Sequence, residues 1–386
     1  MSTLALVGAT VHSGAGWLPG ATVLVEEATI TAVGSEVLVP SDAEILDCAG
    51  RTITAGFWNS HVHFMENKWA DAAAMPRGEL AGQLAEMFVR YGFTTVFDIS
   101  SGYANTQAIR GRVESGEVAG PAILTTGEAL LAPGATPSRQ TLRALGFLPA
   151  TCQVGSVAEA VAAATALLEQ GADGIKLHLQ RPAPPEAPLP AEVIEAVVER
   201  AHAYGKPVFL HPVDAADVLL AARAGVDVVA HTTPRSVWDE PLLAAMHDAG
   251  VALTPTLTVW RSVMRHDRES LLRQFDEDML EQLRDFSSGG GTVLFGTDVG
   301  ATEYDPAPEY AMMARAGLDF RQILASLTTS PAERFGQGQR FGRVEPGYQA
   351  DLVVLDGDPA RDLAALTRVT HTLRAGRIAW ATQDGS

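Results

Sequence analysis

The feature of the sequence that most restricts its fold is a regular alternation of two kinds of segment through the middle of the chain. Apolar runs rich in β-branched residues, which are typical of strands buried on both faces, occur at residues 56–64, 94–100, 122–126, 174–179, 207–211, 226–231, 251–257 and 292–298. Stretches with helical periodicity separate most of them, among them 157–170, 191–204 and 271–286. Strands that alternate in this way with helices predict an α/β fold, a (β/α)8 TIM barrel. A doubly wound open sheet has similar local patterns and is the alternative.

The two ends of the chain have a different pattern, in which short strand-like runs are separated by turns. These runs lie at residues 4–11, 21–26 and 30–33, and again at 350–355, 369–373 and 377–380. The pattern predicts a small β-sandwich module formed by both termini, residues 1–54 and 344–386. The barrel is expected to occupy residues 55–343.

Composition and charge exclude several classes of protein. With 386 residues, of which 47% are apolar, the chain can fill a large core without disulfides. Cys48 and Cys152 are far apart in the sequence, which argues against a thiolate metal site and fits a reducing cytoplasm. The formal net charge of −18 argues against nucleic acid as a partner, because phosphate binding needs clustered Lys and Arg. No signal pattern or run of roughly 18 apolar residues points to a membrane.

Residues able to bind a metal lie in or at the ends of five of the strand-like runs. They are His61 and His63 in the first run, Lys176 in the fourth, His211 in the fifth, His231 in the sixth and Asp298 in the eighth. Positions i and i+2 of a strand point to the same side, so His61 and His63 can reach one metal together. The carboxyl ends of barrel strands meet at one mouth. The pattern therefore predicts a metal centre rather than unrelated buried or surface histidines.

Two acidic residues follow the second and third runs. Asp98 ends the second run and Glu128 lies just beyond the third, so both are expected near the mouth of the barrel. Each either contacts substrate or caps the following helix, and capping is the favoured interpretation.

Taken in order, these motifs resemble the amidohydrolase superfamily over almost the whole chain. The segments that carry the resemblance are AGFWNSHVHF (55–64), GIKLHL (174–179), FLHP (209–212), VVAHTT (228–233), LFGTDVG (294–300), LTTSPAERFG (327–336) and FGRVEPGYQADLVVLDGDP (341–359). HxH alone is a weak motif, whereas the ordered set is highly specific. The subgroup that is most similar comprises imidazolonepropionase-like and Xaa-Pro-dipeptidase-like hydrolases. Ala55 and Asn59 depart from the pattern, since the family usually has Pro and Asp there.

The resemblance implies a binuclear metal centre, with zinc as the expected metal. A free lysine is a poor ligand because its ammonium group only donates hydrogen bonds. The resemblance implies that Lys176 reacts with CO2 to form a carbamate that bridges the two metals. The implied ligands are His61, His63 and Asp298 for one metal, and His211 with His231 for the other. Asp298 is also the expected catalytic residue, which would take a proton from the metal-activated water and deliver it to the leaving group.

The predicted function is metal-dependent hydrolysis of an amide-type C–N bond in a small molecule, such as a dipeptide, N-acyl amino acid, lactam or carbamate. His178 lies two residues beyond Lys176 on the same side of the strand, where it either contacts substrate or packs.

Three other functions stay open. A mononuclear deaminase of the same superfamily does not need Lys176 and usually has a glutamate after the fifth-strand histidine, where this chain continues as Pro-Val-Asp. A phosphotriester or lactone hydrolase uses the same metal pair. A non-catalytic scaffold relative would have lost some of the six ligands. The expected partners are a small-molecule substrate and, from the resemblance, further copies of the chain in a homo-oligomer.

Overall fold

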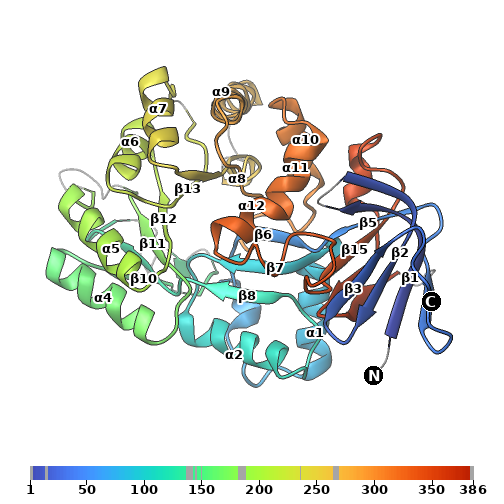
Figure 1. Ribbon diagram of the computed structural model, residues 1–386. Helices are drawn as coiled ribbons and strands as arrows, with labels where there is room; N and C mark the ends of the chain where they lie inside the picture. Colours follow the sequence, from blue (N-terminus) through green and yellow to red (C-terminus); the bar gives the residue numbers. More distant parts are fainter. Residues whose placement is uncertain are drawn as a thin grey trace.

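The computed structural model describes residues 3–13, 16–135, 142–143, 146–148, 150–180, 188–234, 236–263 and 269–382. Within these residues the middle of the chain forms two parallel sheets surrounded by helices (Figure 1). The three-stranded sheet has the order β6 (Phe57–Val62), β7 (Phe93–Asp98), β8 (Ala122–Thr125). The six-stranded sheet has the order β10 (Thr151–Gln153), β9 (Ala129–Leu131), β11 (Ile175–His178), β12 (Val208–His211), β13 (Val228–Ala230), β14 (Ala252–Thr254).

All but the last of the predicted runs contain a parallel strand, which confirms an α/β fold with parallel sheets. The last run, 292–298, forms only an isolated bridge between Val293 and Leu253 of β14. Its other edge lies against β6, because Ser60 N donates a hydrogen bond to Phe295 O at 2.7 Å. The run therefore connects β14 to β6 through scattered backbone hydrogen bonds rather than through the regular ladder of a β-strand.

Four of the α-helices begin at a polar side chain that caps them. Ser156, Asp214 and Asp239 each accept a hydrogen bond from a first-turn backbone N–H, and Asp319 forms a capping box with Gln322. The helices are α1 (Arg77–Met87), α2 (Tyr103–Glu114), α4 (Val157–Glu169), α5 (Ala191–Ala203), α6 (Ala215–Arg223), α7 (Glu240–Asp248), α8 (Val259–Val263), α9 (Glu269–Ser288), α10 (Ala307–Arg315), α11 (Phe320–Leu327) and α12 (Thr329–Arg334), with 3-10 turns η1 (Asn67–Trp69), η2 (Val89–Tyr91) and η3 (Leu363–Thr367).

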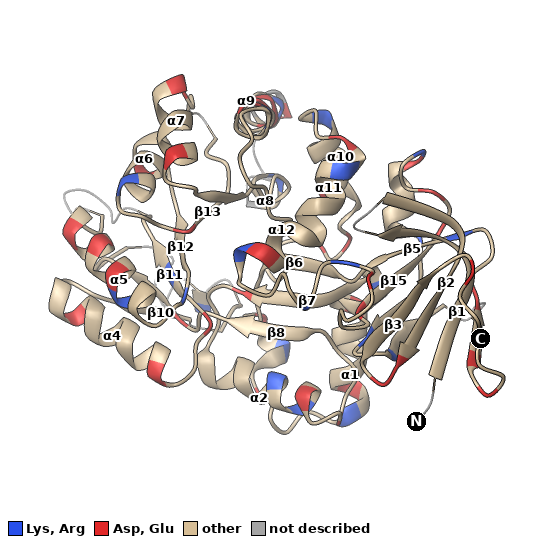
Figure 2. Cartoon of the chain, viewed as in Figure 1, with Lys and Arg blue, Asp and Glu red and all other residues tan. Residues whose placement is uncertain are grey.

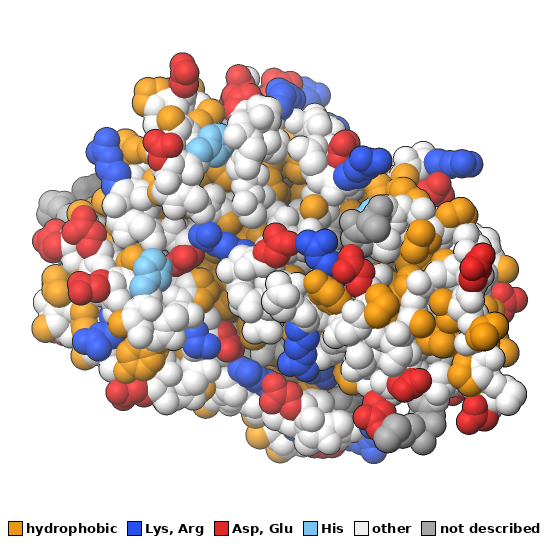
Figure 3. All heavy atoms as spheres, in the orientation of Figure 1, with side chains coloured by type: hydrophobic (Ala, Val, Ile, Leu, Met, Phe, Trp, Pro, Cys, Tyr) orange, Lys and Arg blue, Asp and Glu red, His pale blue; other side chains and the backbone are white. Residues whose placement is uncertain are grey.

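Charged side chains lie mainly on the helices and loops around the sheets (Figure 2). On the face seen in Figure 3, acidic and basic side chains are interspersed rather than segregated. None of the helices in the described ranges is long and apolar enough to cross a bilayer.

Strands from both ends of the chain form one eight-stranded sheet, at the right of Figure 1. Its order is β17 (Arg377–Ala381), β16 (Val369–Arg374), β15 (Leu352–Asp356), β5 (Arg51–Ala55), β1 (Thr3–Ser13), β2 (Gly16–Glu26), β3 (Thr29–Gly34), with β4 (Glu44–Asp47) also paired to β1. The antiparallel pair of β15 and β5 joins the C-terminal strands to the N-terminal ones. The two-layer sandwich and the domain boundaries remain predictions.

β15 also joins this terminal sheet to the α/β part of the chain. Leu352 and Val354 belong to the core of the terminal sheet, whereas Val353 and Leu355 belong to the large core that contains Phe57. These four side chains have no exposed surface. The strand is buried on both faces, which is why its sequence is continuously apolar instead of alternating.

The position of Val353 leads to a stability prediction. Val353→Ala removes two buried methyl groups and should lower the free energy of unfolding by roughly 1.5–3 kcal/mol. Urea titration measures this loss. The matched control is Val237→Ala, because Val237 is 83% exposed and its truncation should change stability by less than about 0.5 kcal/mol. Equal midpoints for the two variants would contradict the packing of β15 between two cores.

Candidate metal centre

The structure brings the six predicted ligands together at the carboxyl ends of the parallel strands. They are His61 in β6 and His63 just after it, Lys176 in β11, His211 at the end of β12, His231 just after β13, and Asp298 at the end of the last run. All are buried except His211, which is partly exposed. Parallel strands place their carboxyl ends on one side of the sheet. His61 and Asp298, which are 237 positions apart in the sequence, therefore become neighbours.

The Asp298 carboxylate lies at the centre of three imidazoles. Its Oδ1 is 2.8 Å from His63 Nε2 and 3.6 Å from His61 Nε2. Its Oδ2 is 3.9 Å from His231 Nε2. Ligand atoms on one tetrahedral zinc ion lie about 3.3 Å apart, given the usual bond lengths. The potential ligand atoms of His61, His231 and Asp298 all lie within 4.8 Å of one another, and they therefore fit around a single ion.

A second group of rings continues from His231 away from His61. The ring centroids of His211 and His231 are 4.5 Å apart. His178 stacks on His211 with centroids 3.9 Å apart and an interplanar angle of 11°, because the two residues are direct neighbours in the register of β11 and β12. His178 is thus in the cluster, and its contact with substrate remains a prediction.

Burial sets the charge of these groups. Loss of solvent lowers the pKa of His61 and of His211 well below the usual histidine range, and lowers that of His231 to about 3. These three imidazoles are therefore neutral, which is the form that binds metals. Burial raises the pKa of Asp298, but its interactions with His63, His231 and Lys176 outweigh this and lower it overall. Asp298 is consequently a carboxylate.

Lys176 is the unusual member of the centre. It is only 2% exposed, and its Nζ has no hydrogen-bond partner among the described residues. The other two lysines of the chain pair with carboxylates, Lys68 with Glu66 at 3.0 Å and Lys206 with Asp173 at 3.6 Å. Burial lowers the pKa of Lys176 to about 7, although the Asp298 charge opposes this shift.

Further buried polar atoms in the centre lack partners. The Nδ1 atoms of His61 and His63 accept or donate no hydrogen bond within the described part of the chain. Buried polar atoms are nearly always paired, and an unpaired group of them beside neutral imidazoles and a carboxylate fits a site for a divalent metal ion. The chemistry of the donor set, nitrogen with oxygen and without thiolate, is that of zinc hydrolase sites.

Three side chains orient the ligands, namely Asn59, Thr297 and Thr256, and of these the sequence analysis singled out only Asn59. Asn59 Nδ2 donates to Thr297 Oγ1 at 2.8 Å, and its Oδ1 accepts from Thr297 N at 3.2 Å and His61 N at 3.3 Å. A carboxylate could not donate the first of these bonds. Asn59 thus links the first strand to the last run. Thr256 Oγ1 lies 2.5 Å from His231 Nδ1, which leaves the Nε2 of that ring for the centre.

Backbone strain is concentrated at the same place. His231 and Asp298 have φ angles of 78° and 58°, and Thr256 has 43°. Residues other than glycine seldom adopt this left-handed region, which costs of order 1–3 kcal/mol. Backbone hydrogen bonds hold the strained residues, since His231 N donates to Thr254 O at 2.8 Å and Asp298 N to His61 O at 2.9 Å.

The two acidic residues expected near the mouth have structural roles. Asp98 is buried and accepts hydrogen bonds from Ser101, Thr106 and Thr125 at 2.5, 2.9 and 2.8 Å. Ser101 Oγ in turn accepts from the backbone N–H of Phe64, directly after His63. Glu128 accepts from Tyr103 N at the start of α2, a helix that precedes it in the chain. The interpretation of Glu128 as a cap of the following helix therefore stays a prediction, and Asp98 supports the loop behind the ligands.

Trp260 forms a wall of the site that sequence patterns did not reveal. Its ring centroid lies 6.1 Å from that of His231 and 6.5 Å from that of His211, and its Nε1 donates to Thr232 O at 3.1 Å. It comes from the short helix α8, which follows β14. Loops after barrel strands carry no periodic signal, and only the position of residue 260 after a strand-like run could have indicated this role.

Comparisons with known proteins agree with this geometry. Residues 52–379 match the amidohydrolase family, and the chain belongs to that family. Ochratoxinase from Aspergillus niger is 22% identical over 406 aligned positions, which cover 94% of this chain and 83% of that protein. The crystal structure of a Xaa-Pro dipeptidase with bound methionine has a TM-score of 0.82 at 21% identity, and covers 99% of this chain and all of that one. A putative prolidase from Bifidobacterium longum has a TM-score of 0.82 at 26% identity, with coverages of 98% and 95%.

The close packing of Gly296 gives a test of the centre. A Cβ at this residue would lie 2.3 Å from Thr254 Cγ2 and 2.7 Å from His61 Cβ. We expect Gly296→Ala to fold but to displace His61, and so to retain less metal after dialysis. Gly82→Ala is the matched control, because a Cβ at Gly82 meets nothing within 4 Å. Metal content by atomic emission spectroscopy measures the effect, and full retention by Gly296→Ala would argue against His61 as a ligand.

Proposed function

We propose that this chain is a metal-dependent hydrolase that cleaves an amide-type C–N bond of a small molecule. The observation that carries the proposal is the convergence of neutral imidazoles, a carboxylate and a buried, unpaired lysine at one end of the parallel sheets. Membership of the amidohydrolase family supports it. So do the names of the similar proteins, since a dipeptidase and a prolidase act on amide bonds.

The proposed centre holds two divalent ions, with zinc expected. The ligands would be His61, His63 and Asp298 for one ion, and His211 with His231 for the other, with a carbamate on Lys176 between them. Such ions act as Lewis acids and lower the pKa of water towards neutrality.

The chain's own groups have distinct tasks in this proposal. The neutral imidazoles donate lone pairs. Asp298, kept as a carboxylate by His63 and its other neighbours, accepts the proton of the attacking water and returns it to the leaving nitrogen. Trp260 and His178 border the site on the side of His211 and would contact the substrate.

A carbamate on Lys176 separates this proposal from a mononuclear deaminase, which does not need the lysine. An ammonium group buried without a partner is costly, whereas a carbamate is an anionic oxygen ligand. The position of Lys176 supports carbamate formation. His61, His211 and His231 all lie close enough to interact electrostatically with it, so a carbamate there would lie among the other proposed ligands.

The proposal for the fold is that the two parallel sheets belong to one barrel of residues 55–343. Only residues 126–128 separate β8 from β9, so these short strands would be parts of one barrel strand. The run 292–298 bonds to both β14 and β6, which supports closure on the other side. Residues 1–54 and 344–386 would form the β-sandwich module. A homo-oligomer remains a prediction from the resemblance.

The carbamate can be tested directly because the chain has only three lysines. In protein exchanged with 13C-bicarbonate in the presence of Zn²⁺, we expect one carbamate carbon signal by NMR. Lys176→Ala should abolish this signal and lower the metal content, and short carboxylic acids should restore part of the activity. Lys206→Ala, which removes a lysine that is partly exposed and ion-paired, should change none of these properties. A signal that survives in Lys176→Ala would place the carbamate elsewhere.

The hydrolytic role of Asp298 is tested on a panel that comprises a dipeptide, an N-acyl amino acid, a lactone and a phosphotriester, with added Zn²⁺ or Mn²⁺. We expect the amide substrates to be hydrolysed. Asp298→Asn should fold and hold metal, yet lose kcat by roughly 10²- to 10⁴-fold, the usual contribution of proton transfer. The control Asp305→Asn changes an exposed carboxylate that accepts a bond from Ala307 N, which an amide oxygen can also accept. Near-normal kcat in Asp298→Asn would remove it from proton transfer.

A further inference from the structure

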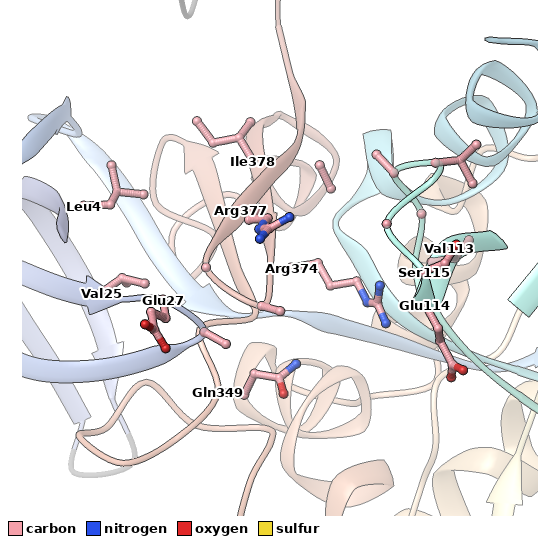
Figure 4. A pocket seen from close by; sticks show the side chains of 18 of the residues that line it. Leu4, Val25, Glu27, Val113, Glu114, Ser115, Gln349, Arg374, Arg377 and Ile378 are labelled. Atoms are coloured by element: carbon pink, nitrogen blue, oxygen red, sulfur yellow. The ribbon is translucent and has the colours of Figure 1, made fainter. Parts of the chain in front are cut away.

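A cleft of about 1090 Å³ lies between the terminal sheet and the end of α2 (Figure 4). One wall comes from β1, β2 and the turn after β2, including Leu4, Val25 and Glu27. The other comes from residues 113–120, which end α2 and lead to β8. The turn between β16 and β17 reaches into the middle of the cleft and brings Arg374 and Arg377 there.

The cleft contains an unusual group of arginines. Four of them line it, namely Arg77, Arg340, Arg374 and Arg377. Within the described part of the chain, none of the four forms an ion pair, that is, none has a carboxylate oxygen within 4.0 Å of its guanidinium nitrogens. Seven arginines elsewhere in the described part of the chain do have such a partner, namely Arg110, Arg112, Arg261, Arg334, Arg343, Arg361 and Arg368. Arg340 donates a hydrogen bond to the uncharged Gln349 side chain. In a chain with a net charge of −18, four arginines in one cleft form a local concentration of positive charge.

Arg374 is the most enclosed of the four. Its Nε is buried and has no hydrogen-bond partner among the described residues. Asp351, just before the neighbouring strand β15, accepts through Oδ1 from Ala375 N at 2.7 Å and from Gln349 Nε2 at 2.9 Å. Burial lowers the pKa of Arg374, although the charges of Asp351 and Glu114 oppose this shift. Figure 4 shows the guanidinium group of Arg374 extending towards the end of α2, and that of Arg377 nearer the middle of the cleft. A buried donor that lacks a partner is costly, so a ligand that accepts from it would be stabilised.

We propose that this cleft binds a small anion with two or more negative charges, carried by phosphate or carboxylate groups. The guanidinium fork donates parallel hydrogen bonds to the oxygens of either group, and partial exclusion of water strengthens such charge-assisted bonds. Glu27 lies on the far wall, and Glu114 is already paired with Arg110 at 3.0 Å. The anion would therefore sit between the guanidinium groups of Arg374 and Arg377, with Arg340 and Arg77 at the edge.

This anion site is separate from the metal centre. Residues 116–120 precede β8 and so lie at the amino ends of the parallel strands, whereas the metal ligands lie at the carboxyl ends. A bound anion and a bound substrate would not compete directly. Because the lining residues come from both the terminal sheet and the α/β part, the anion would also connect the two and stabilise the folded chain by mass action.

The test is isothermal titration calorimetry of the metal-loaded protein with inorganic phosphate and, separately, with succinate. The ionic strength is kept at about 0.15 M, where the Debye length is about 8 Å, so that diffuse attraction is screened. We expect one saturable site for at least one anion. Phosphate binding without succinate binding would assign a phosphorylated ligand, and the reverse would assign a dicarboxylate.

Variants of the two central arginines locate the site. The double variant with Arg374→Gln and Arg377→Gln should raise Kd by roughly tenfold or more, since two charge-assisted contacts are removed. Arg361→Gln removes one positive charge at an arginine that lies outside the cleft and pairs with Asp358, and it should leave Kd unchanged.

If the double variant does not fold, Arg377→Gln alone, which changes an exposed side chain, should weaken binding. The proposal is wrong if the wild type binds neither anion, or if the arginine variants bind as tightly as the wild type. If phosphate binds only to the metal ions, the arginine variants would bind it as tightly as the wild type does.

Discussion

The hydrogen bonds between β6 and the run 292–299 are the interaction on which the metal centre depends. Ser60 N donates to Phe295 O, Asp298 N to His61 O, and His63 N to Val299 O, at 2.7, 2.9 and 2.8 Å. These bonds hold His61 and His63 directly beside the Asp298 carboxylate. Since the run is not a regular strand, its hydrogen bonds are few, and the Asn59 amide adds two more across the same junction, both with Thr297.

The same junction explains the strained backbone of Asp298 and the presence of a glycine at residue 296. Asp298 has a left-handed backbone, which lets its carboxylate turn back towards the histidines while its N–H still bonds to His61. Gly296 has no side chain, and so the run approaches His61 closely. Strain and close packing of this kind persist only where surrounding contacts impose them. Here the contacts are the Asn59 amide and the adjacent backbone bonds, and what they secure is the position of one carboxylate.

The parts of this arrangement that could be predicted from sequence are those with a repeating physical cause. Buried parallel strands need continuous apolar runs, and parallel strands bring their carboxyl ends together, so the positions of His61, Lys176 and His211 followed from the pattern. β9 and β10 have three residues each, which is too short for any periodicity to be recognised. The irregular run 292–298 looks like a strand because its residues are equally apolar. Trp260 lies on a loop helix, and nothing in local sequence determines how such a loop packs against a distant histidine.

The balance of charge in the centre supports the proposed carbamate on Lys176. Without metals it has neutral imidazoles, one carboxylate and a lysine whose burial opposes its charge. A pair of divalent ions would bring four positive charges into this enclosed space, and Asp298 alone offsets one. Conversion of Lys176 to a carbamate replaces a group that repels cations with one that attracts them, and supplies the oxygen ligands that the imidazoles lack. Burial disfavours the charged form of the lysine, and its Nζ has no hydrogen-bond partner among the described residues. Its burial among the proposed metal ligands is intelligible if the functional form is the modified one, and this is the strongest physical reason for proposing a binuclear centre.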